Sequence, residues 1–481
     1  MDNVTEPDAG TTSAQSSAKP LLGEGSLTPD FLRLSSIPVN YVQQLETDLL
    51  EPVVFNQGSA TSDGFCRFTL QNKGFLHSHS KIFLGLKLQD GSNDAVGDFP
   101  MPHIGVGQVV KKAVLKIGNK AINEIDAWRH LFAAKSTLIT NENNLERELY
   151  MTGRGISHDF NYTLGSRFES SGYGLDNGLE TVADDVKIPE WLRITSDDKT
   201  NPSLSIDLSD LFPFLKVNQL PLYMITEPIN IELTFYPQVG QRVQIKNGQT
   251  ANILCDILRD DLKFCADYIY YGATDEMERY AAANPEINFS FVDYRVVESS
   301  TTRAALQSSV VRNLGMANRL VPRVLTAISD SSVSEDGLLG EVNSLAPLYN
   351  ASGVVGVVTK TSYNFKYNDR FEYTTAIDNS ARLFSEFTNS EGIPFITRQE
   401  FSDECKAGGM SGTYAGHDQD DELSGQFFNL GTKLTNGRVG QRGVDLFIGG
   451  DFPAGTDIMR NFCEYVRVAT LRDGMFEIYN A

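Results

Sequence analysis

The sequence predicts an all-β protein built from two tandem eight-stranded jelly rolls, which are β-sandwiches, with short helices and long loops. Three observations predict this fold: many short runs in which apolar and polar residues alternate, long stretches rich in Gly, Ser and Asp, and an internal repeat. The chain has 481 residues, which is too long for one ordinary core, so we expect two large domains.

The internal repeat indicates that the two domains are similar. An aromatic run over 264–272 begins with Phe264-Cys265, and Phe462-Cys463 begins a similar run near the C-terminus. A second echo follows the same order in both halves: a strand, a polar turn, a short strand and a helix. It matches segments 115–120, 125–126 and 128–132 with segments 365–370, 377–378 and 381–384.

The first domain is expected to consist mostly of strands. A helix over 126–138, with Asp126 as its N-cap, interrupts them. The polar segment 140–200 is expected to be a long loop, which inside a compact domain usually has a function. Alternation predicts strands at 65–70, 81–88, 109–117, 203–208, 228–235 and 264–272.

The second domain repeats this plan. Asp473-Gly474 predicts a hairpin turn before a last strand at 475–478. A helix is expected at 379–388, and the segments 329–352 and 402–440 are expected to be long loops. Strands are predicted at 287–298, 305–312, 319–328, 354–368, 371–375, 443–448 and 460–470.

A short helix is expected to join the domains. Thr274 is a good N-cap for a helix that starts at Asp275, and Pro285 ends it because the residue before proline avoids the helical conformation. Met277 and Tyr280 recur at helical spacing and can pack against one domain. We therefore divide the chain into a flexible N-terminal arm and lead-in (1–48), a first jelly roll (49–274), a connector helix (275–285) and a second jelly roll (286–481).

Composition restricts the function. The formal charge is −21 and the isoelectric point is near 4.7, which argues against direct nucleic-acid binding because phosphate contacts need clustered Lys and Arg. No apolar run reaches a membrane-spanning length, and the polar N-terminus is unlike a signal peptide, so we expect synthesis in an intracellular space. An odd number of cysteines without a CxxC pair predicts free thiols, and Cys265 and Cys463 are expected to be buried because they lie inside apolar strands. The cysteines are Cys66, Cys255, Cys265, Cys405 and Cys463.

No catalytic, cofactor-binding or metal-binding residue is assigned from the sequence. His77 and His79 would lie on one face of a strand and form half of a zinc site. No other His or Cys cluster completes that site nearby, so a solvated strand end is the simpler interpretation. The acidic run 418–422 lacks the Gly and the bidentate Glu of a helical-hand calcium loop, which favours an exposed loop.

Four other patterns also favour structural roles. The glycines of 105–107 open a strand and lack the third Gly of a dinucleotide-binding loop, and 409–412 fails the nucleophile-elbow spacing. The tyrosines of 268–271 could stack on bases, but their acidic surroundings favour packing within a sheet. Trp128 is interpreted as a core anchor of its helix. Glycosylation triplets, interpreted as chance matches, begin at Asn161, Asn288 and Asn350.

Three segments carry a family resemblance. Residues 109–128 combine a strand, a Gly118-Asn119 turn, Ile125-Asp126 and a helix that contains a tryptophan; 220–233 form an apolar strand pattern; and 264–296 form the domain junction. These segments resemble the double jelly-roll major capsid proteins of the adenovirus-like lineage, and most closely those of virophages, Polinton-like viruses and large algal DNA viruses.

The resemblance implies a structural protein of the virion capsid, assembled inside the host cell, and no enzyme or cofactor. Members of this family form homotrimers with a pseudo-hexameric outline that tile an icosahedral shell. The implied partners are two further copies of the chain, neighbouring capsomers, and minor capsid or penton proteins.

Two other classes of function remain open at this point. A tandem jelly-roll carbohydrate-binding or attachment protein would carry a sugar or calcium site in its loops. A β-sandwich enzyme such as a glycosidase would need a pair of carboxylates that face a cleft.

The N-terminal arm generates the first prediction. Residues 1–25 are polar and aperiodic, so they cannot bury enough apolar surface to offset their ordering entropy. A chain without them should fold and form the same oligomer as the full chain by circular dichroism and light scattering, while the yield or size of particles in electron micrographs changes. A truncated chain that does not fold would show that the arm belongs to a core.

Overall fold

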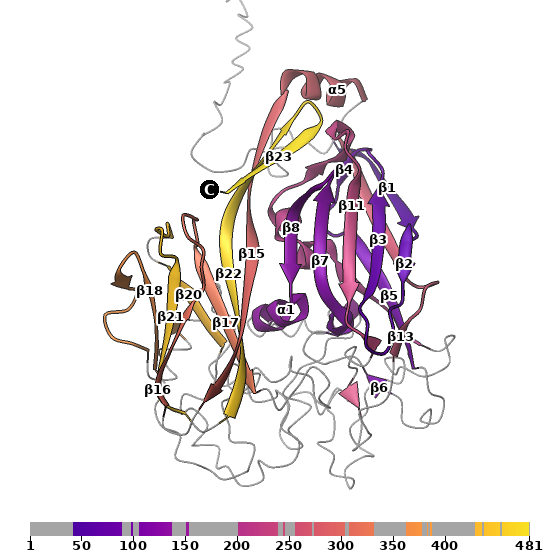
Figure 1. Cartoon of the computed structure of the whole chain (residues 1–481). Helices are drawn as coiled ribbons and strands as arrows, with labels where there is room; N and C mark the ends of the chain where they lie inside the picture. The colour runs from indigo at the N-terminus through magenta and orange to yellow at the C-terminus, as the bar shows by residue number, and fades with distance from the viewer. Residues whose placement is uncertain are drawn as a thin grey trace, which may run out of the picture.

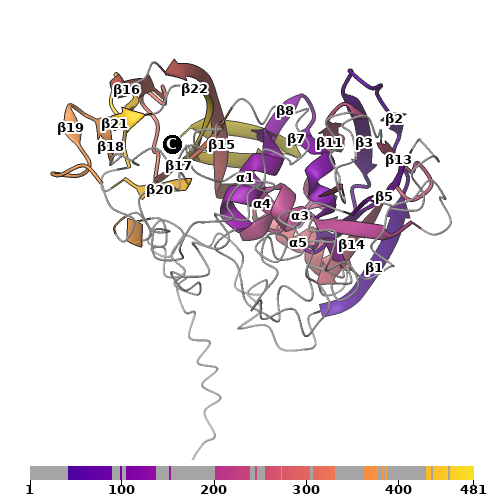
Figure 2. The same cartoon turned by 90° about the horizontal axis from the view of Figure 1, so that it is seen from below.

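The computed structural model shows two β-sandwiches that lie side by side (Figures 1 and 2). The N-terminal arm, the acidic run 418–422, Cys405, most of 379–388 and most of the predicted long loops lie outside the described residues. The structure describes residues 42–88, 98–99, 105–136, 151–152, 201–238, 244–245, 255–271, 274–303, 307–330, 362–377, 382, 385–386, 429–434, 437–452 and 455–480.

The first sandwich packs a seven-stranded sheet against a five-stranded sheet. Its strands are β1 (Val42–Leu50), β2 (Val54–Asn56), β3 (Gly64–Leu70), β4 (Phe75–Leu76), β5 (Lys81–Leu88), β7 (Val110–Ile117), β8 (Lys120–Asp126), β9 (Ser203–Asp207), β10 (Leu220–Pro221), β11 (Ile229–Phe235), β13 (Cys255–Ile257) and β14 (Lys263–Tyr271). The larger sheet has the order β10-β4-β14-β5-β13, and β1 and β9 pair with β14 and β5. The smaller sheet has the order β2-β3-β11-β7-β8, so β8 is an edge strand.

The second sandwich packs a five-stranded sheet against a four-stranded sheet among the residues described. Its strands are β15 (Glu286–Arg303), β16 (Gln307–Asn313), β17 (Arg323–Asp330), β18 (Ser362–Tyr367), β19 (Arg370–Phe371), β20 (Asn429–Lys433), β21 (Val444–Phe452), β22 (Gly455–Arg472) and β23 (Met475–Asn480). The larger sheet has the order β15-β22-β17-β20, with β23 also on β22, and the smaller has the order β16-β21-β18-β19. The predicted all-β fold of two sandwiches is therefore confirmed, with twelve and nine strands described where eight each were expected.

Short helices and one small sheet complete the described elements. They are β6 (Asp98–Phe99) paired with β12 (Gln244–Ile245), the helices α1 (Trp128–Ser136), α3 (Leu208–Leu211), α4 (Pro213–Val217) and α5 (Thr274–Ala283), and the 3₁₀ turns η4 (Val106–Val109) and η8 (Leu222–Met224). The connector α5 lies where the sequence predicts it, and Met277 packs with Phe75, Ile269 and Tyr271 of the first sandwich.

Three local predictions were wrong. The helix predicted from residue 126 starts at Trp128, because Asp126 still belongs to β8 and forms an ion pair with Lys112 at 3.0 Å. The strand predicted at 371–375 is reduced to the two residues of β19. A strand, β1, occupies part of the expected lead-in, where Leu45 and Leu49 alternate with polar residues but face outward and so give no core pattern.

Two hairpin turns consist of residues that tolerate positive φ angles. Asp473 and Gly474 have φ angles of 51° and 79° and join β22 to β23, as predicted. Asn368 and Asp369 have φ angles of 52° and 60° and join β18 to β19. Such two-residue loops match the twist of the flanking strands only with positive φ angles, which Gly, Asn and Asp tolerate best.

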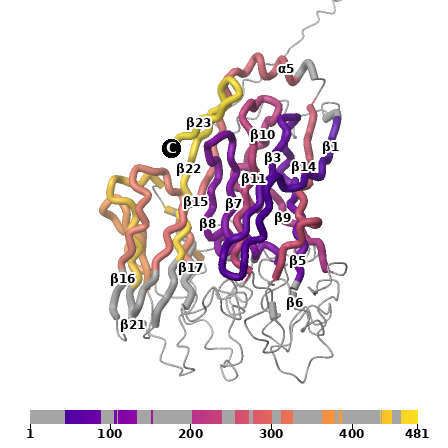
Figure 3. Tube along the Cα trace, turned by 45° about the vertical axis from the view of Figure 1, so that its right-hand side comes forward, coloured from indigo at the N-terminus to yellow at the C-terminus, as the bar shows by residue number. Residues whose placement is uncertain are grey.

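The internal repeat falls on equivalent strands of the two sandwiches. Phe264 lies on β14, which pairs with β1, the first strand of its sandwich. Phe462 lies on β22, which pairs over 18 residues with β15, again the first strand. Segments 115–120 and 365–370 form the β7–β8 and β18–β19 hairpins. The two sandwiches therefore repeat one plan (Figure 3).

The fold predicts the reactivity of the thiols. Cys66, Cys255 and Cys463 are buried in the sandwiches, and burial raises the pKa of Cys463 to about 12, so little reactive thiolate forms. Cys265 was expected to be buried, but it lies on the outer face of β14 and is only half-buried. Alkylation of the folded chain followed by peptide mass mapping should therefore label Cys265 first among these four. In denaturant without reductant all five thiols should react, and fewer labels would reveal a disulfide.

Candidate functional site: the junction between the jelly rolls

The most elaborate polar site of the described chain lies between the two sandwiches. Strand β8, the edge of the first sandwich, lies beside β15, the edge of the second (Figures 1 and 3). At their closest approach β15 carries Asp293, whose residue surface is only 2 % exposed. A carboxylate so deep in a protein needs partners, because an unpaired buried charge is strongly unfavourable.

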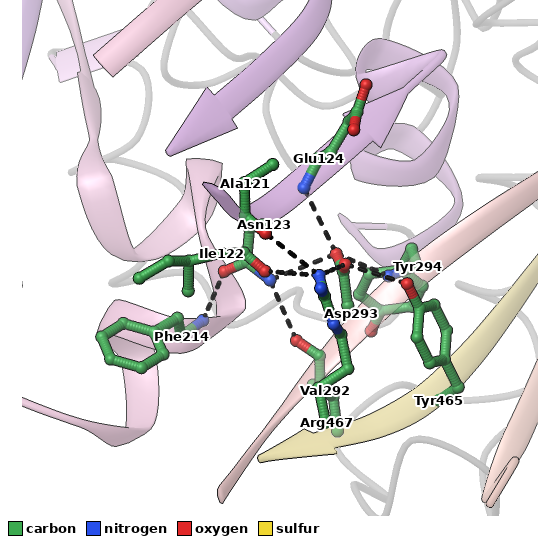
Figure 4. Close-up of polar contacts among 10 residues, drawn as sticks. All are labelled: Ala121, Ile122, Asn123, Glu124, Phe214, Val292, Asp293, Tyr294, Tyr465 and Arg467. Atoms are coloured by element: carbon green, nitrogen blue, oxygen red, sulfur yellow. Dashed lines mark hydrogen bonds and ion pairs between the residues drawn. The ribbon is translucent and has the colours of Figure 1, made fainter. Parts of the chain in front are cut away.

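Asp293 accepts hydrogen bonds from both sandwiches (Figure 4). Its Oδ1 accepts from Asn123 Nδ2 at 3.2 Å and from the backbone N–H groups of Glu124 at 3.4 Å and Tyr294 at 3.0 Å. Its Oδ2 accepts from the Tyr465 hydroxyl at 3.1 Å and from Arg467 Nη1 at 2.8 Å. Burial raises the pKa of Asp293, while Arg467 and Asn123 oppose the rise. Every partner is a donor, so the arrangement suits an ionised carboxylate.

The partners of Asp293 extend the contact into the first sandwich (Figure 4). Arg467 Nη1 also donates to the carbonyl oxygens of Ala121 at 3.3 Å and Ile122 at 2.9 Å. Asn123 donates to the carbonyl of Val292 at 3.2 Å, and its Oδ1 accepts from the backbone N–H of Phe214 at 2.9 Å. The edge of β8, which would otherwise present unpaired carbonyls, is thus satisfied by side chains of the second sandwich.

Aromatic rings pack beside this polar network. Phe214 of α4 meets Phe291 edge-on with ring centroids 5.0 Å apart, and it also contacts Phe289 at 5.6 Å. Phe289 stacks in turn on Phe476 of β23 at 5.7 Å. These rings bury apolar area on both sides of the junction, and aromatic pairs add about 0.5–1.5 kcal/mol each beyond that area.

The β22–β23 hairpin makes a third contact. The carbonyl of Gly474 in its turn accepts a hydrogen bond from the backbone N–H of Thr226 at 2.9 Å, and Phe476 N–H donates to Glu227 Oε2 at 3.1 Å. Lys120 of β8 donates to the carbonyl of Phe476. A Cβ at Gly474 would lie 2.6 Å from Thr226 Cγ2, so the contact also excludes a larger residue there.

An open groove of about 940 Å³ runs along this junction. Residues of both signs of charge line it, including Lys120, Glu124, Arg295, Arg319 and Glu477. Asp293 and Arg467 in its wall already form an ion pair with each other at 2.8 Å. Within the described residues no group of three or more His, Cys, Asp or Glu side chains is placed to hold a metal ion.

The residues weighed in the sequence analysis lie elsewhere. His77 and His79 lie in the turn between β4 and β5, not on a strand, with ring centroids 5.3 Å apart. Trp128 is 1 % exposed, which confirms the core anchor, and stacks on Phe132. Tyr268 and Tyr271 are buried in the first sandwich, which confirms their packing role. The triplets at 161 and 350 and the segment 409–412 lie outside the described residues.

Sequence reasoning missed the junction residues. Asp293 and Arg467 fall inside runs predicted as strands. The signal that could have identified them is a charged residue at a strand position where the alternation predicts burial. Their separation of 174 residues left nothing in the sequence to pair them.

Comparisons with known proteins support the fold. A scan against models of protein families finds no match, and neither does a search of curated protein sequences. Among solved structures, the chain is similar to the capsid of the virus PBCV-1 (TM-score 0.55, 10 % identity, 92 % of this chain and 98 % of that one). It is similar to PBCV-1 VP54 fitted into a reconstruction of the virophage Sputnik (0.53, 10 %, 92 % and 98 %), and to Sputnik itself (0.52, 9 %, 92 % and 90 %). The fold is therefore that of a double jelly-roll protein, as the sequence predicted.

The junction generates a prediction about stability. The Asp293→Ala substitution removes a buried carboxylate from its five donors and leaves the partly exposed Arg467 without its counter-ion, so the free energy of unfolding should fall by about 3 kcal/mol. Glu286→Ala is the matched control, because Glu286 also lies on β15 and pairs with an arginine of β22, Arg472, but at an exposed position. The control should leave the urea midpoint nearly unchanged. Equal midpoints for the two variants would contradict the role assigned to Asp293.

Proposed function

We propose that this chain is a structural major capsid protein whose copies trimerise into pseudo-hexameric capsomers and tile an icosahedral viral shell. The observation that carries the proposal is the pair of similar sandwiches locked together by buried contacts into one unit. The similarity to the PBCV-1 capsid and to Sputnik covers 92 % of the chain, which supports the same use of the fold.

The division of the chain follows from the same plan. We place the connector at 275–285, where α5 leaves the last strand of one sandwich before β15 opens the next. The first jelly roll precedes it and the second follows, and residues before β1 form the arm. The partners of the chain are two further copies, neighbouring capsomers and minor capsid or penton proteins, and its location is the virion capsid.

The features of the described residues agree with an assembly role. A subunit of a shell must be a rigid block with defined edges. The stacked rings and the ion pair at the junction make the two sandwiches one rigid block. The proposal assigns no catalytic residue and no cofactor. No helix of the described chain is long and apolar enough to cross a bilayer.

The proposal predicts a stable homotrimer. Closed rings of identical chains arise when one interface is used repeatedly with a rotation that closes. Light scattering of the purified chain at micromolar concentration should give about three times the chain mass, and electron micrographs should show capsomers or larger particles. A chain that stays monomeric under all assembly conditions would overturn the capsid role and favour the tandem carbohydrate-binding or attachment protein, which glycan arrays would then test.

A further inference from the structure

The strands that meet at the junction have equivalents on the outside of the molecule. Strand β15 is equivalent to β1, because each is the first strand of its sandwich and pairs with the strand that carries the Phe-Cys repeat. Strand β8 is equivalent to β19, because each is the second strand of the repeated hairpin. Within the chain β8 packs on β15, whereas β1 and β19 are edge strands of the described sheets.

The pairing of β1 with β14 and of β15 with β22 aligns β1 with β15 residue by residue. Val296 lies opposite Phe462 on β22, and Leu50 lies opposite Phe264 on β14. Counting back from these pairs places Leu45 at the position of Phe291. The same count places Thr47 at the position of Asp293 and Leu49 at that of Arg295.

Burial differs sharply between the equivalent positions. Phe291 and Asp293, covered by the first sandwich, are 3 % and 2 % exposed, whereas their equivalents are exposed: Leu45 is 62 % exposed and Thr47 is also an exposed residue. The same contrast holds for the other side of the contact. Asn123 of β8 is 0 % exposed, whereas both residues of β19 are exposed, including 51 % of Phe371.

The polar centre of the junction is also repeated on the outer face of β1. Thr47 Oγ1 donates to Asp267 Oδ1 at 2.6 Å, and Asp267 stands on β14 where Tyr465 stands on β22. A hydroxyl and a carboxylate therefore meet at both places. At the junction the carboxylate lies on the first strand, β15, whereas on the outer face the hydroxyl lies on the first strand, β1. At the junction Asp293 uses its carboxylate to bind β8; on the outer face the carboxylate of Asp267 is available for a similar contact.

These two surfaces lie at opposite ends of the molecule. Figure 2 shows β19 at the far side of the second sandwich and β1 at the far side of the first. Phe371 is extended by Phe447, whose ring it meets edge-on at 5.2 Å, and by the cations Lys366 and Arg370 of the same hairpin. An apolar surface with cations thus faces away from one end of the chain, and an apolar surface with a carboxylate faces away from the other.

We propose that the β19 surface of one copy packs against the outer face of β1 in the next copy, in the way that β8 packs against β15 within the chain. The interface is heterologous: Phe371 meets the face that carries Leu45 and Leu49, and the cations of the β18–β19 hairpin approach Asp267. Repetition of such a head-to-tail contact closes into a ring when its rotation closes. This inference rests on the proposed function and specifies the surfaces that join the trimer.

Two variants test the inference because each removes one half of the contact. The β1 variant, Leu45→Asp with Leu49→Asp, and the β19 variant, Phe371→Asp, place charges where apolar surfaces should meet. Each variant should fold, since these side chains are exposed. The molar mass measured by light scattering should fall from about three chain masses to about one. Val217→Asp is the matched control, because Val217 is 68 % exposed but lies on neither surface, and it should remain trimeric.

Mixing the two variants gives the decisive measurement. The β1 variant keeps an intact β19 surface and the β19 variant keeps an intact β1 surface, so together they should form a heterodimer that cannot grow further. An interface between two identical surfaces would not produce this result. If either variant loses its β-rich spectrum, Leu45→Thr with Leu49→Thr and Phe371→Ser replace them.

The outcomes distinguish a failure of the proposed interface from a failure of the proposed capsid function. If the wild-type chain is monomeric, the capsid proposal itself fails. If the wild-type chain is trimeric and both variants remain trimeric, the trimer stands but these surfaces do not form it. If the variants are monomeric and do not associate when mixed, the head-to-tail pairing of β19 with β1 is overturned.

Discussion

The buried carboxylate of Asp293 is the interaction on which the arrangement of the two sandwiches depends. Removing a carboxylate and a guanidinium from water costs several kcal/mol for each ion, and only good geometry with further hydrogen bonds repays it. Here the donors come from both sandwiches, since Asn123 and the N–H of Glu124 belong to the first and Tyr465 and Arg467 to the second. A displacement of the first sandwich would remove two donors, Asn123 and the Glu124 N–H, from a buried carboxylate, so the junction favours one relative placement of the sandwiches.

The repeat explains why the inner and proposed outer contacts share a plan but differ in chemistry. A junction within one chain forms once, during folding, so buried ions are never exposed again. A contact between chains must desolvate its groups each time it forms, and exposed leucines such as Leu45 and Leu49 cost less to desolvate than an arginine–aspartate pair. The same strand positions can therefore serve both contacts after a few substitutions.

Much of the fold could be predicted from the sequence because its signals are local. Alternation gave the strands that have one face in a core, such as β3 and β11, and Asp473-Gly474 gave the last hairpin. Strand β1 was missed because Leu45 and Leu49 face outward, which inverts the expected pattern. The junction could not be predicted, because Asp293 finds Asn123 at a separation of 170 residues and neither residue belongs to a recognisable motif.

The low sequence identity to the similar structures arises because the fold depends on local patterns that many sequences satisfy. A sandwich core needs apolar residues of suitable volume at alternating positions and turn residues at a few places, and many sequences satisfy those conditions. Identity near 10 % over 92 % of the chain is what such permissive constraints allow. The junction is less permissive, because each donor around Asp293 has a fixed distance and direction. The fold is therefore specified by patterns spread along the chain, whereas the relative placement of its halves is specified by a few side chains. The surfaces proposed for assembly inherit their geometry from that placement.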